Sequence, residues 1–434
     1  MLLLAFACLG LLAVANALRP IRWSPLVLPA FFSAWLTVEL APQLIVLTLL
    51  VAGSCIALGS WTWLALAIAA ADLAGLVWMV LQSERAAQVA DSALSEWVEP
   101  VAEPHVPNLL RRFFVPMAFS HPDVERIVDV PYSEESRRLK LDVYVNRERP
   151  IGAPTLVQVH GGAWVIGDKK EQGRPLMLHL ARQGWVCFAP NYRLSPRATF
   201  PDHLIDVKRA IAWVREHGAE YGADPGFMVL TGGSAGGQLT TLCALTQNDP
   251  EYQPGFEEAD TSIQGCIPYY GVYDLAAETG TRAARLRKRT LLAKRVLKTH
   301  DEDAFRRASP LARLHPTSTA TPTPAHERNP QGCIPGSDTL ADSVHEGERA
   351  GVEVPPFLVI HGRNDTLVPV EEARLLVQRL RAQSGQPVVY LELPGTQHAF
   401  DVFPSIRSDH VVRAVGRFCE FLRVSGHQPA ARDH

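Results

Sequence analysis

The sequence predicts an α/β fold, in which a mostly parallel sheet is covered by helices on both faces and is preceded by a helical membrane region. Beyond Asp123, short apolar segments typical of strands alternate with longer amphipathic segments typical of helices. Such alternation is the pattern of parallel strands joined by crossover helices. Before Gln82, in contrast, nearly all of the chain is apolar. We therefore expect a membrane part followed by a larger globular part.

Three N-terminal segments approach the length of about 20 apolar residues that a helix needs to cross a bilayer. They are residues 2–18, 41–59 and 61–81. Residues 26–40 are also apolar but shorter, and they fit a fourth span, a re-entrant segment or an interfacial helix. The small residues that end at Ala17 resemble a signal-peptide cleavage site, but no basic residue precedes the apolar run. We expect three or four transmembrane helices within residues 1–82, which makes the lipid bilayer one partner of the chain.

Basic residues beside the apolar segments predict the orientation. Arg19 and Arg22 follow the first segment, and Arg85, Arg111 and Arg112 follow the third. Such residues favour the cytoplasmic side. Three spans would put both groups on that side, whereas four spans would separate them. The three-span arrangement predicts an integral protein of the cell membrane whose globular domain is cytoplasmic.

A connecting segment is expected between the two parts. Residues 83–99 have the composition of an amphipathic helix, and Pro100, Pro104 and Pro107 then interrupt the chain. The expected division is therefore residues 83–122 for helix and linker, 123–425 for the globular domain and 426–434 for a flexible tail.

Charge and cysteine content exclude some classes of function. The chain has 42 Lys and Arg against 45 Asp and Glu, a net charge of −3, which argues against a nucleic-acid partner. Its seven cysteines show no metal-binding spacing, so free and mostly buried thiols are expected. We expect neither a metal nor a cofactor.

The first two predicted strands, residues 124–132 and 139–145, alternate apolar and polar side chains as an antiparallel pair with one buried face does. Further strands are predicted at residues 155–159, 185–193, 226–233, 262–271, 355–365 and 387–395, and helices at residues 173–184, 201–222, 234–247, 370–385 and 411–422.

Two segments interrupt this alternation. Residues 275–310 contain the basic run RAARLRKR, and they fit either a cap helix over a site or a solvated surface helix. Residues 315–353 are rich in Pro, Thr, Ser and Ala and have few large apolar residues. Because such a composition buries too little surface to fold alone, a disordered insertion is expected there.

A glycine-rich turn predicts a nucleophile. Residues 232–236, GGSAG, fit the pattern G-x-S-x-G between a predicted strand and a predicted helix. In such a nucleophile elbow a strained turn exposes the serine, here Ser234, while the helix N-terminus offers N–H groups to a developing anion. A phosphate-binding loop is the rival interpretation, but neither the dinucleotide pattern nor the P-loop is present.

A second glycine motif supports the first. Residues 160–164, HGGAW, follow the predicted strand 155–159. An HGG loop supplies backbone donors to an oxyanion hole, so Gly161 and Gly162 are the expected donors, together with the N–H of Ala235. His160 is expected to orient this loop rather than to transfer protons.

A serine needs a base, and the base needs an orienting carboxylate. Asp365 follows the apolar strand that ends at Ile360, and His398 follows the strand that ends at Leu393. Both lie at strand ends, as Ser234 does, and the order Ser, Asp, His is the one found with nucleophile elbows. His361 and Asp401 do not fit that order.

Six motifs together resemble the α/β-hydrolase superfamily of serine esterases and lipases, on its hormone-sensitive-lipase-like side: HGGAW, NYRLSP, FPDHLIDVKRAIAWV, GGSAGGQL, HGRNDTLVP and GTQHAF. The N-terminal apolar region makes the chain most similar to actinobacterial Lip-type carboxylesterases with N-terminal spans. The resemblance covers about residues 124–312 and 356–423. It implies an α/β-hydrolase fold and a membrane-anchored enzyme that cleaves small apolar carboxylic esters through an acyl-enzyme.

Two residues depart from the hormone-sensitive-lipase pattern. Gly233 precedes the serine where Asp is usual, and Asn191 stands where Asp is frequent. These departures keep amide or formamide hydrolysis and prenylcysteine methyl ester hydrolysis open as alternatives with the same triad. A catalytically inactive hydrolase fold that serves as a binding module is a more distant alternative.

Overall fold

The computed structural model describes residues 1–22, 24–98, 120–314 and 354–425. The prolines of the expected linker, the expected insertion at 315–353 and the expected tail at 426–434 lie outside these ranges.

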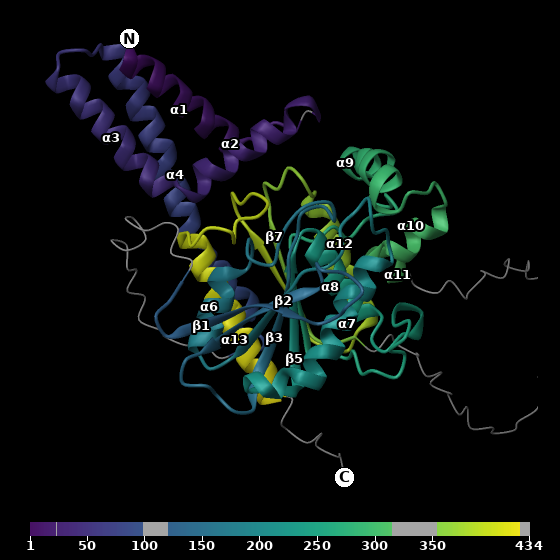
Figure 1. The fold of residues 1–434 in the computed structure, drawn as a ribbon. Coiled ribbons are helices and arrows are strands. Elements are labelled where there is room, and N and C mark those ends of the chain that lie inside the picture. The colour runs from purple at the N-terminus through teal and green to yellow at the C-terminus, as the bar shows by residue number, and fades with distance from the viewer. Residues whose placement is uncertain (23, 99–119, 315–353, 426–434) are drawn as a thin grey trace, which may run out of the picture.

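An eight-stranded sheet forms the centre of the globular part (Figure 1). Its strand order is β1-β2-β4-β3-β5-β6-β7-β8; β2 pairs antiparallel with β1 and β4, and the remaining pairs are parallel. The strands are β1 (Val124–Pro131), β2 (Lys140–Asn146), β3 (Ala153–Val159), β4 (Val186–Pro190), β5 (Ala223–Gly233), β6 (Gly265–Tyr269), β7 (Phe357–Gly362) and β8 (Val388–Leu393). The mostly parallel sheet and the antiparallel first pair are thus confirmed.

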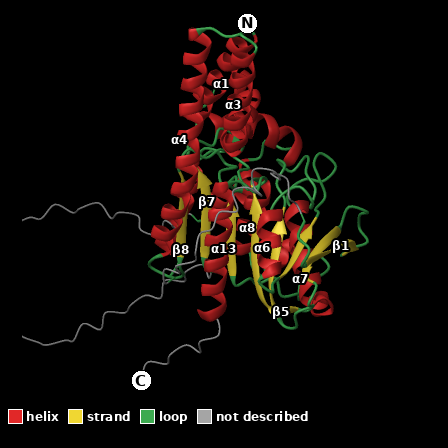
Figure 2. Cartoon of the chain, turned by 90° about the vertical axis from the view of Figure 1, so that its left-hand side faces the viewer, coloured by secondary structure: helices red, strands yellow, loops and turns green. Residues whose placement is uncertain are grey.

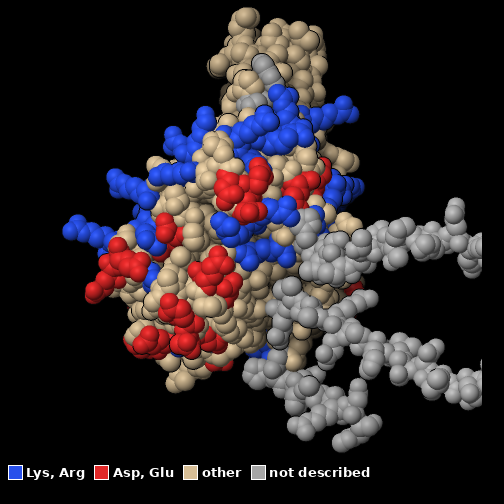
Figure 3. All heavy atoms as spheres, turned by 90° about the vertical axis from the view of Figure 1, so that its right-hand side faces the viewer, with Lys and Arg blue, Asp and Glu red and all other residues tan. Residues whose placement is uncertain are grey.

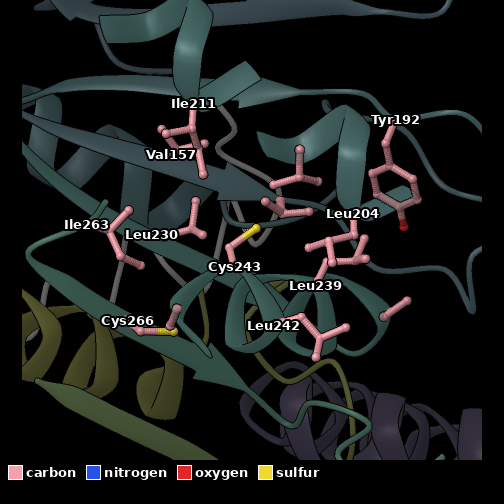
Figure 4. Packing of buried hydrophobic residues seen from close by; sticks show 14 of the residues in the cluster. Val157, Tyr192, Leu204, Ile211, Leu230, Leu239, Leu242, Cys243, Ile263 and Cys266 are labelled. Carbon is pink, nitrogen blue, oxygen red and sulfur yellow. The ribbon is translucent and has the colours of Figure 1, made fainter. Parts of the chain in front are cut away.

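Helices cover both faces of the sheet, so that its core has two halves. One face carries α7 (Asp202–His217), α8 (Ala235–Leu245) and α12 (Val370–Gln383); the other carries α6 (Arg174–Arg182) and α13 (Ile406–Ser425). In the first half Val157 and Leu230 of the sheet pack against Ile211 of α7 and Leu239 of α8 (Figure 4).

The thiols behave as expected within the described residues. Six cysteines are free, and all of these except Cys8 are buried. Cys243 and Cys266 lie in the core that Figure 4 shows.

The N-terminal residues form a separate bundle above one edge of the sheet (Figures 1 and 2). It consists of α1 (Leu2–Leu18), η1 (Ser24–Leu26), α2 (Val27–Glu39), α3 (Ala41–Ala57) and α4 (Trp63–Leu94). Among the described helices only α4 is by itself long and apolar enough to cross a membrane. The α2 and α3 helices would form a second candidate only as one segment bent by 85°, and α1 has 17 residues. The structure therefore offers one or two spans by length, where the sequence predicted three or four.

The fourth helix belongs to both parts of the molecule. It runs without a break for 32 residues, past the position near Gln82 where the apolar sequence ends. Ala86, Ala90 and Leu94 of its second half are buried in the same core half as α6 and α13. In Figure 2 this half of α4 continues downward from the bundle toward α13. A single rigid helix therefore joins the bundle to the sheet.

An ion pair adds a second connection. Glu39, the last residue of α2, accepts a hydrogen bond of 2.6 Å from Nη1 of Arg407 in α13, and both side chains are almost completely buried. Ser405 donates to the other carboxylate oxygen at 2.5 Å. The end of α2 is thereby held against the domain that carries the sheet.

The remaining helices lie in loops. The segment after β6 contains α9 (Arg282–Arg287), the π-helix η4 (Lys288–Val296), α10 (Glu302–Ala308) and α11 (Pro310–Arg313), and two short 3-10 helices are η2 (Gly218–Tyr221) and η3 (Pro250–Tyr252). Leu292 and Val296 of η4 are buried in the core, and Leu311 N–H donates to the carbonyl of Tyr273. One face of this segment therefore packs on the domain.

Replacement of Glu39 by Ala should destabilise the protein strongly, because it leaves the Arg407 guanidinium buried without its carboxylate. Removing one partner of a buried pair costs about 3–5 kcal/mol. The measurement is denaturant unfolding of the full chain in detergent. The control is Glu420→Ala, which breaks an exposed pair with Arg423 on the same helix α13 and should cost less than about 1 kcal/mol. Equal losses in the two variants would contradict a structural role for the Glu39–Arg407 pair.

Candidate active site

Ser234 lies at the point where β5 ends and α8 begins, at the carboxyl edge of the parallel strands. Its backbone has φ 57° and ψ −118°, a conformation that a residue with a side chain adopts only under strain. The turn is held from both sides, because Ser234 N–H donates to the Tyr269 carbonyl and the Gln238 N–H donates to the Ser234 carbonyl, each at 3.0 Å. This is the geometry of a nucleophile elbow.

The elbow requires a helix that starts directly against a strand. A Cβ atom added to Gly236 would lie 2.7 Å from the carbonyl oxygen of His160 and even closer to that of Val159. Only glycine therefore allows α8 to approach the end of β3 so closely. The same contact brings the HGG loop beside Ser234.

That loop touches the elbow. A Cβ added to Gly161 would lie 2.6 Å from the Gly233 carbonyl oxygen and 3.0 Å from Cβ of Ser234. The next residue, Gly162, has φ 112°. Ala235 is the first residue of α8, so its N–H has no acceptor within the helix. Backbone donors from two segments thus lie around the serine.

The expected donors are not equally available. Gly161 N–H donates to Oε1 of Gln172 at 2.7 Å. An oxyanion can use this N–H only when the Gln172 side chain moves away. Among the described residues, no hydrogen bond engages the N–H group of Gly162 or of Ala235. Gln172 carries no catalytic motif in the sequence, and only the folded loop reveals its contact.

His160 is fixed within the loop. Its Nδ1 lies 2.7 Å from the Gly161 carbonyl oxygen, and its ring stacks on Tyr192 at 4.4 Å between centroids. Burial lowers the pKa of His160 to about 4. The side chain is therefore neutral at pH 7 and orders the loop through these contacts.

Asp365 and His398 meet across the loops that follow β7 and β8. His398 Nδ1 lies 2.6 Å from Oδ2 of Asp365, so its N–H donates to the carboxylate. The other oxygen of Asp365 accepts the N–H groups of Leu367 and Val368, each at 2.8 Å. The hydrogen bond at Nδ1 leaves Nε2 of His398 as the nitrogen that can accept a proton.

Asp365 also contacts a second histidine. His361 Nε2 lies 3.4 Å from Asp365 Oδ2 and 3.0 Å from the Val368 carbonyl oxygen. Burial alone would raise the pKa of Asp365, but His398 and His361 outweigh it, so the pKa lies well below its usual range. His361 is completely buried and uses Nε2 for these contacts. It therefore cannot exchange a proton with a bound substrate as His398 can.

Tyr270 connects the elbow with the histidine. Its ring centroid lies 4.4 Å from that of His398, and its hydroxyl donates to Asp401. A Cβ added to Gly233 would lie 2.7 Å from the same hydroxyl oxygen. Gly233 stands where Asp is usual because Tyr270 fills the space that a side chain at position 233 would need.

The second departure also has a physical reason. Asn191 accepts the N–H of Lys169 at 2.7 Å and donates through Nδ2 to Asp168 at 3.1 Å. An aspartate at this position would place a second carboxylate against Asp168. The amide therefore lets Asn191 fix the loop that follows HGG.

The N-terminal bundle reaches the site. Phe31 of α2 contacts the ring of His398, edge to face, with 6.4 Å between the centroids. Trp35, one turn further on, donates through Nε1 to the carbonyl of Ala399 at 3.0 Å. Helix α2 therefore packs directly on the loop that carries His398.

The structure thus brings Ser234 together with the HGG loop, and Asp365 together with His398. It adds Tyr270, Gln172, Phe31 and Trp35, which the sequence did not single out. Tyr270 directly follows β6, and that position at the end of a strand was the one available signal. Phe31 and Trp35 are indistinguishable in the sequence from lipid-facing residues.

These features define a hydrolase fold with a nucleophile elbow, and comparisons with known proteins agree. The BD-FAE family model matches residues 141–323. The chain is 44% identical over 301 residues to the probable carboxylic ester hydrolase LipM of Mycobacterium tuberculosis, covering 69% of this chain and 62% of LipM. It is 36% identical over 332 residues to esterase LipC of the same organism, covering 76% of this chain and 71% of LipC.

The chain belongs to the Lip-type esterases of the α/β-hydrolase superfamily, as the motifs indicated. It spans slightly less than two thirds of the length of LipM. The fold is also that of an inhibited esterase B from Lactobacillus rhamnosis, with a TM-score of 0.55 and 19% identity over 80% of this chain and 100% of the other.

A side chain at position 233 should disturb the site through Tyr270. We expect Gly233→Asp to lower kcat for ester hydrolysis and to destabilise the fold by about 1–3 kcal/mol, because the new atoms overlap the Tyr270 ring. In a Tyr270→Ala background the further loss caused by Gly233→Asp should be much smaller. The measurement is a double-mutant cycle on stability and kcat, and additive effects would contradict the proposed contact.

Two buried histidines should make the protein sensitive to acid. Burial lowers the pKa of His160 and of His203 to about 4, whereas an exposed histidine titrates near 6.5. Above pH 6.5 both histidines are neutral in the folded and in the unfolded chain. Below pH 6.5 they gain protons in the unfolded chain first, because their pKa is higher there. Stability should therefore fall between pH 6.5 and 4 by about 1.4 kcal/mol per pH unit for each histidine.

The check is denaturant unfolding of the full chain at several pH values. His203→Gln should reduce the slope of the unfolding free energy against pH by the contribution of one histidine. His300→Gln, at an exposed position, serves as the control. An unchanged slope in His203→Gln would contradict the assignment.

Proposed function

We propose that this protein is a membrane-anchored serine hydrolase that cleaves carboxylic esters, with Ser234, Asp365 and His398 as its catalytic triad. The observation that carries the proposal is the 2.6 Å contact between His398 and Asp365 at the edge of the sheet where the strained elbow presents Ser234. The names of LipM and LipC as ester hydrolase and esterase favour esters over amides as substrates.

The first half of the reaction forms an acyl-enzyme. His398 Nε2 removes the proton of the Ser234 hydroxyl, and Oγ attacks the ester carbonyl carbon. The carbonyl oxygen becomes an anion that receives hydrogen bonds from the N–H groups of Gly162 and Ala235, and from that of Gly161 once Gln172 has turned away. Each such donor lowers the barrier by roughly 3–4 kcal/mol. The C–O bond to the alcohol breaks, and His398 gives the alcohol its proton.

The second half releases the acid. His398 takes a proton from water, the resulting hydroxide attacks the acyl carbon, and the bond to Ser234 Oγ breaks as the serine regains a proton. Asp365 stabilises the imidazolium in both halves. Its low pKa keeps it ionised throughout the neutral range, as this role demands.

Membrane attachment through α4 is part of the proposal. Residues 63–81 of this helix are apolar except for the buried Asp72, and its second half is fixed to the globular part by burial. The basic residues that follow the first and third apolar segments support a cytoplasmic globular domain. We further propose that residues 275–310 form a cap at the carboxyl edge, since α9 to α11 contact Tyr273 and Asp274 beyond β6.

Ser234→Ala should abolish turnover of p-nitrophenyl esters and labelling by a fluorophosphonate, with unchanged unfolding. His398→Asn should lower kcat at least roughly 10⁴-fold, because it removes the base. His361→Asn is the matched control, since this histidine also contacts Asp365, and it should retain most activity. Labelling of Ser234→Ala, or equal losses in the two histidine variants, would contradict the triad.

A further inference from the structure

Two segments from different parts of the chain contact the loops that carry the candidate site. Helix α2 packs on the His398 loop through Phe31 and Trp35. On the other side, Arg287 of α9 donates to the Asp274 carbonyl, and the Ala308 carbonyl accepts from Gln238 of α8. Both segments therefore lie beside the loops and the helix that surround Ser234 and His398.

The outer face of α2 is apolar. Leu28, Phe32 and Leu36 follow one another at intervals of four residues, and their exposed fractions are 57%, 52% and 40%. They form one stripe along the helix. Phe32 contacts the rings of Phe31 and Trp35, so the stripe borders the face that packs on the domain. Because α2 lies at 85° to α3, it runs across the bundle rather than along it. This is the geometry of a helix that lies in the interface of a bilayer.

The outer face of α9 and η4 is basic. Residues 281–300 contain eight Lys and Arg and no acidic residue. Two of the eight are engaged, Arg287 with Glu372 and Lys288 with Glu302. The other six are exposed, and within the described part of the chain no carboxylate pairs with them. We call these six residues the basic face: Arg282, Arg285, Arg289, Lys294, Arg295 and Lys298.

The two faces lie on the same side of the molecule. In Figure 1, α9 stands at the height of α2, beside the N-terminal bundle. Figure 3 shows Lys and Arg side chains gathered directly below the uncharged bundle on this side, while many acidic side chains lie farther from it. The exposed Arg19 and Arg22 lie in the connection between α1 and α2 and add to this positive region.

We propose that the basic face of α9 and η4 binds the anionic lipid headgroups of the bilayer that holds the N-terminal helices. This docking rests on the proposed membrane attachment. It places the approach to Ser234 at the bilayer surface, with the apolar stripe of α2 among the acyl chains. The substrates that this arrangement favours are esters dissolved in the bilayer rather than esters free in water.

The charge pattern fits this partner. Each Lys or Arg close to an anionic membrane surface strengthens binding about fivefold, and the attraction declines within a Debye length of about 8–10 Å. Six exposed cations, five on α9 and η4 and Lys298 just beyond them, therefore suffice to hold a domain that a helix already tethers nearby. Salt should weaken the contact, whereas the burial of α4 should not depend on salt.

The test uses the full chain in nanodiscs of phosphatidylcholine, with and without phosphatidylglycerol. Hydrogen exchange of residues 282–298 should slow at least about fivefold when phosphatidylglycerol is present. Under the same condition, kcat/KM for a long-chain ester dissolved in the bilayer should rise, while kcat/KM for a water-soluble acetate ester should stay constant.

Two triple variants remove three positive charges each. Arg285→Gln, Arg289→Gln and Lys294→Gln together should eliminate both effects of phosphatidylglycerol. The control changes Arg147, Arg182 and Arg381 to Gln; these are exposed at the amino ends of β4 and β8, opposite to Ser234, and the control should behave like wild type.

The outcomes separate the proposals. Equal exchange with and without phosphatidylglycerol, or equal behaviour of the two triple variants, would overturn the docking. Equal protection by soluble polyphosphate in phosphatidylcholine discs would also overturn it, since the basic face would then be a general polyanion site. Failure to hydrolyse the acetate ester would instead contradict the triad, and failure to enter nanodiscs would contradict the membrane attachment.

Discussion

The close crossing of β3, β5 and α8 at Ser234 is the constraint on which the site depends. Gly236 lets the first turn of α8 touch the end of β3, and Gly161 lets the HGG loop touch the elbow. The crossing forces Ser234 into a strained conformation with positive φ and at the same time directs the helix N-terminus at it. The strain is tolerated because β5 is an inner strand of the sheet, hydrogen-bonded on both sides to β3 and β6.

Around this fixed point the N-terminal helices pack on the candidate site and on the sheet rather than standing apart from them. The second half of α4 covers the sheet beside α13, and the buried Glu39–Arg407 pair holds the end of α2. Phe31 and Trp35 consequently lie against the loop of the proposed catalytic histidine. Under the proposed membrane attachment, such an arrangement links the position of the bilayer to the environment of the site.

The fold and much of the candidate site could be predicted because their signals are local. Strands and helices follow from the periodicity of side chains, and Ser234, Asp365 and His398 each follow a recognisable apolar strand. Tyr270 and Gln172 could not be found in this way, since their importance depends on contacts with residues distant in sequence. The bundle shows the same limit: apolar composition predicted separate spans, yet packing bends α2 from α3 and extends α4 into the domain.

The sequence by itself determined the class of fold, the order of the motifs and the identity of the family, because periodicity, glycine placement and strand-end residues are encoded over a few positions. Only the tertiary structure decided why Gly233 replaces the usual Asp, which N–H groups are free to bind an oxyanion, and where α2 lies. Each of these depends on the space that a distant side chain occupies. A linear pattern records which residues are present, but close packing determines which atoms meet.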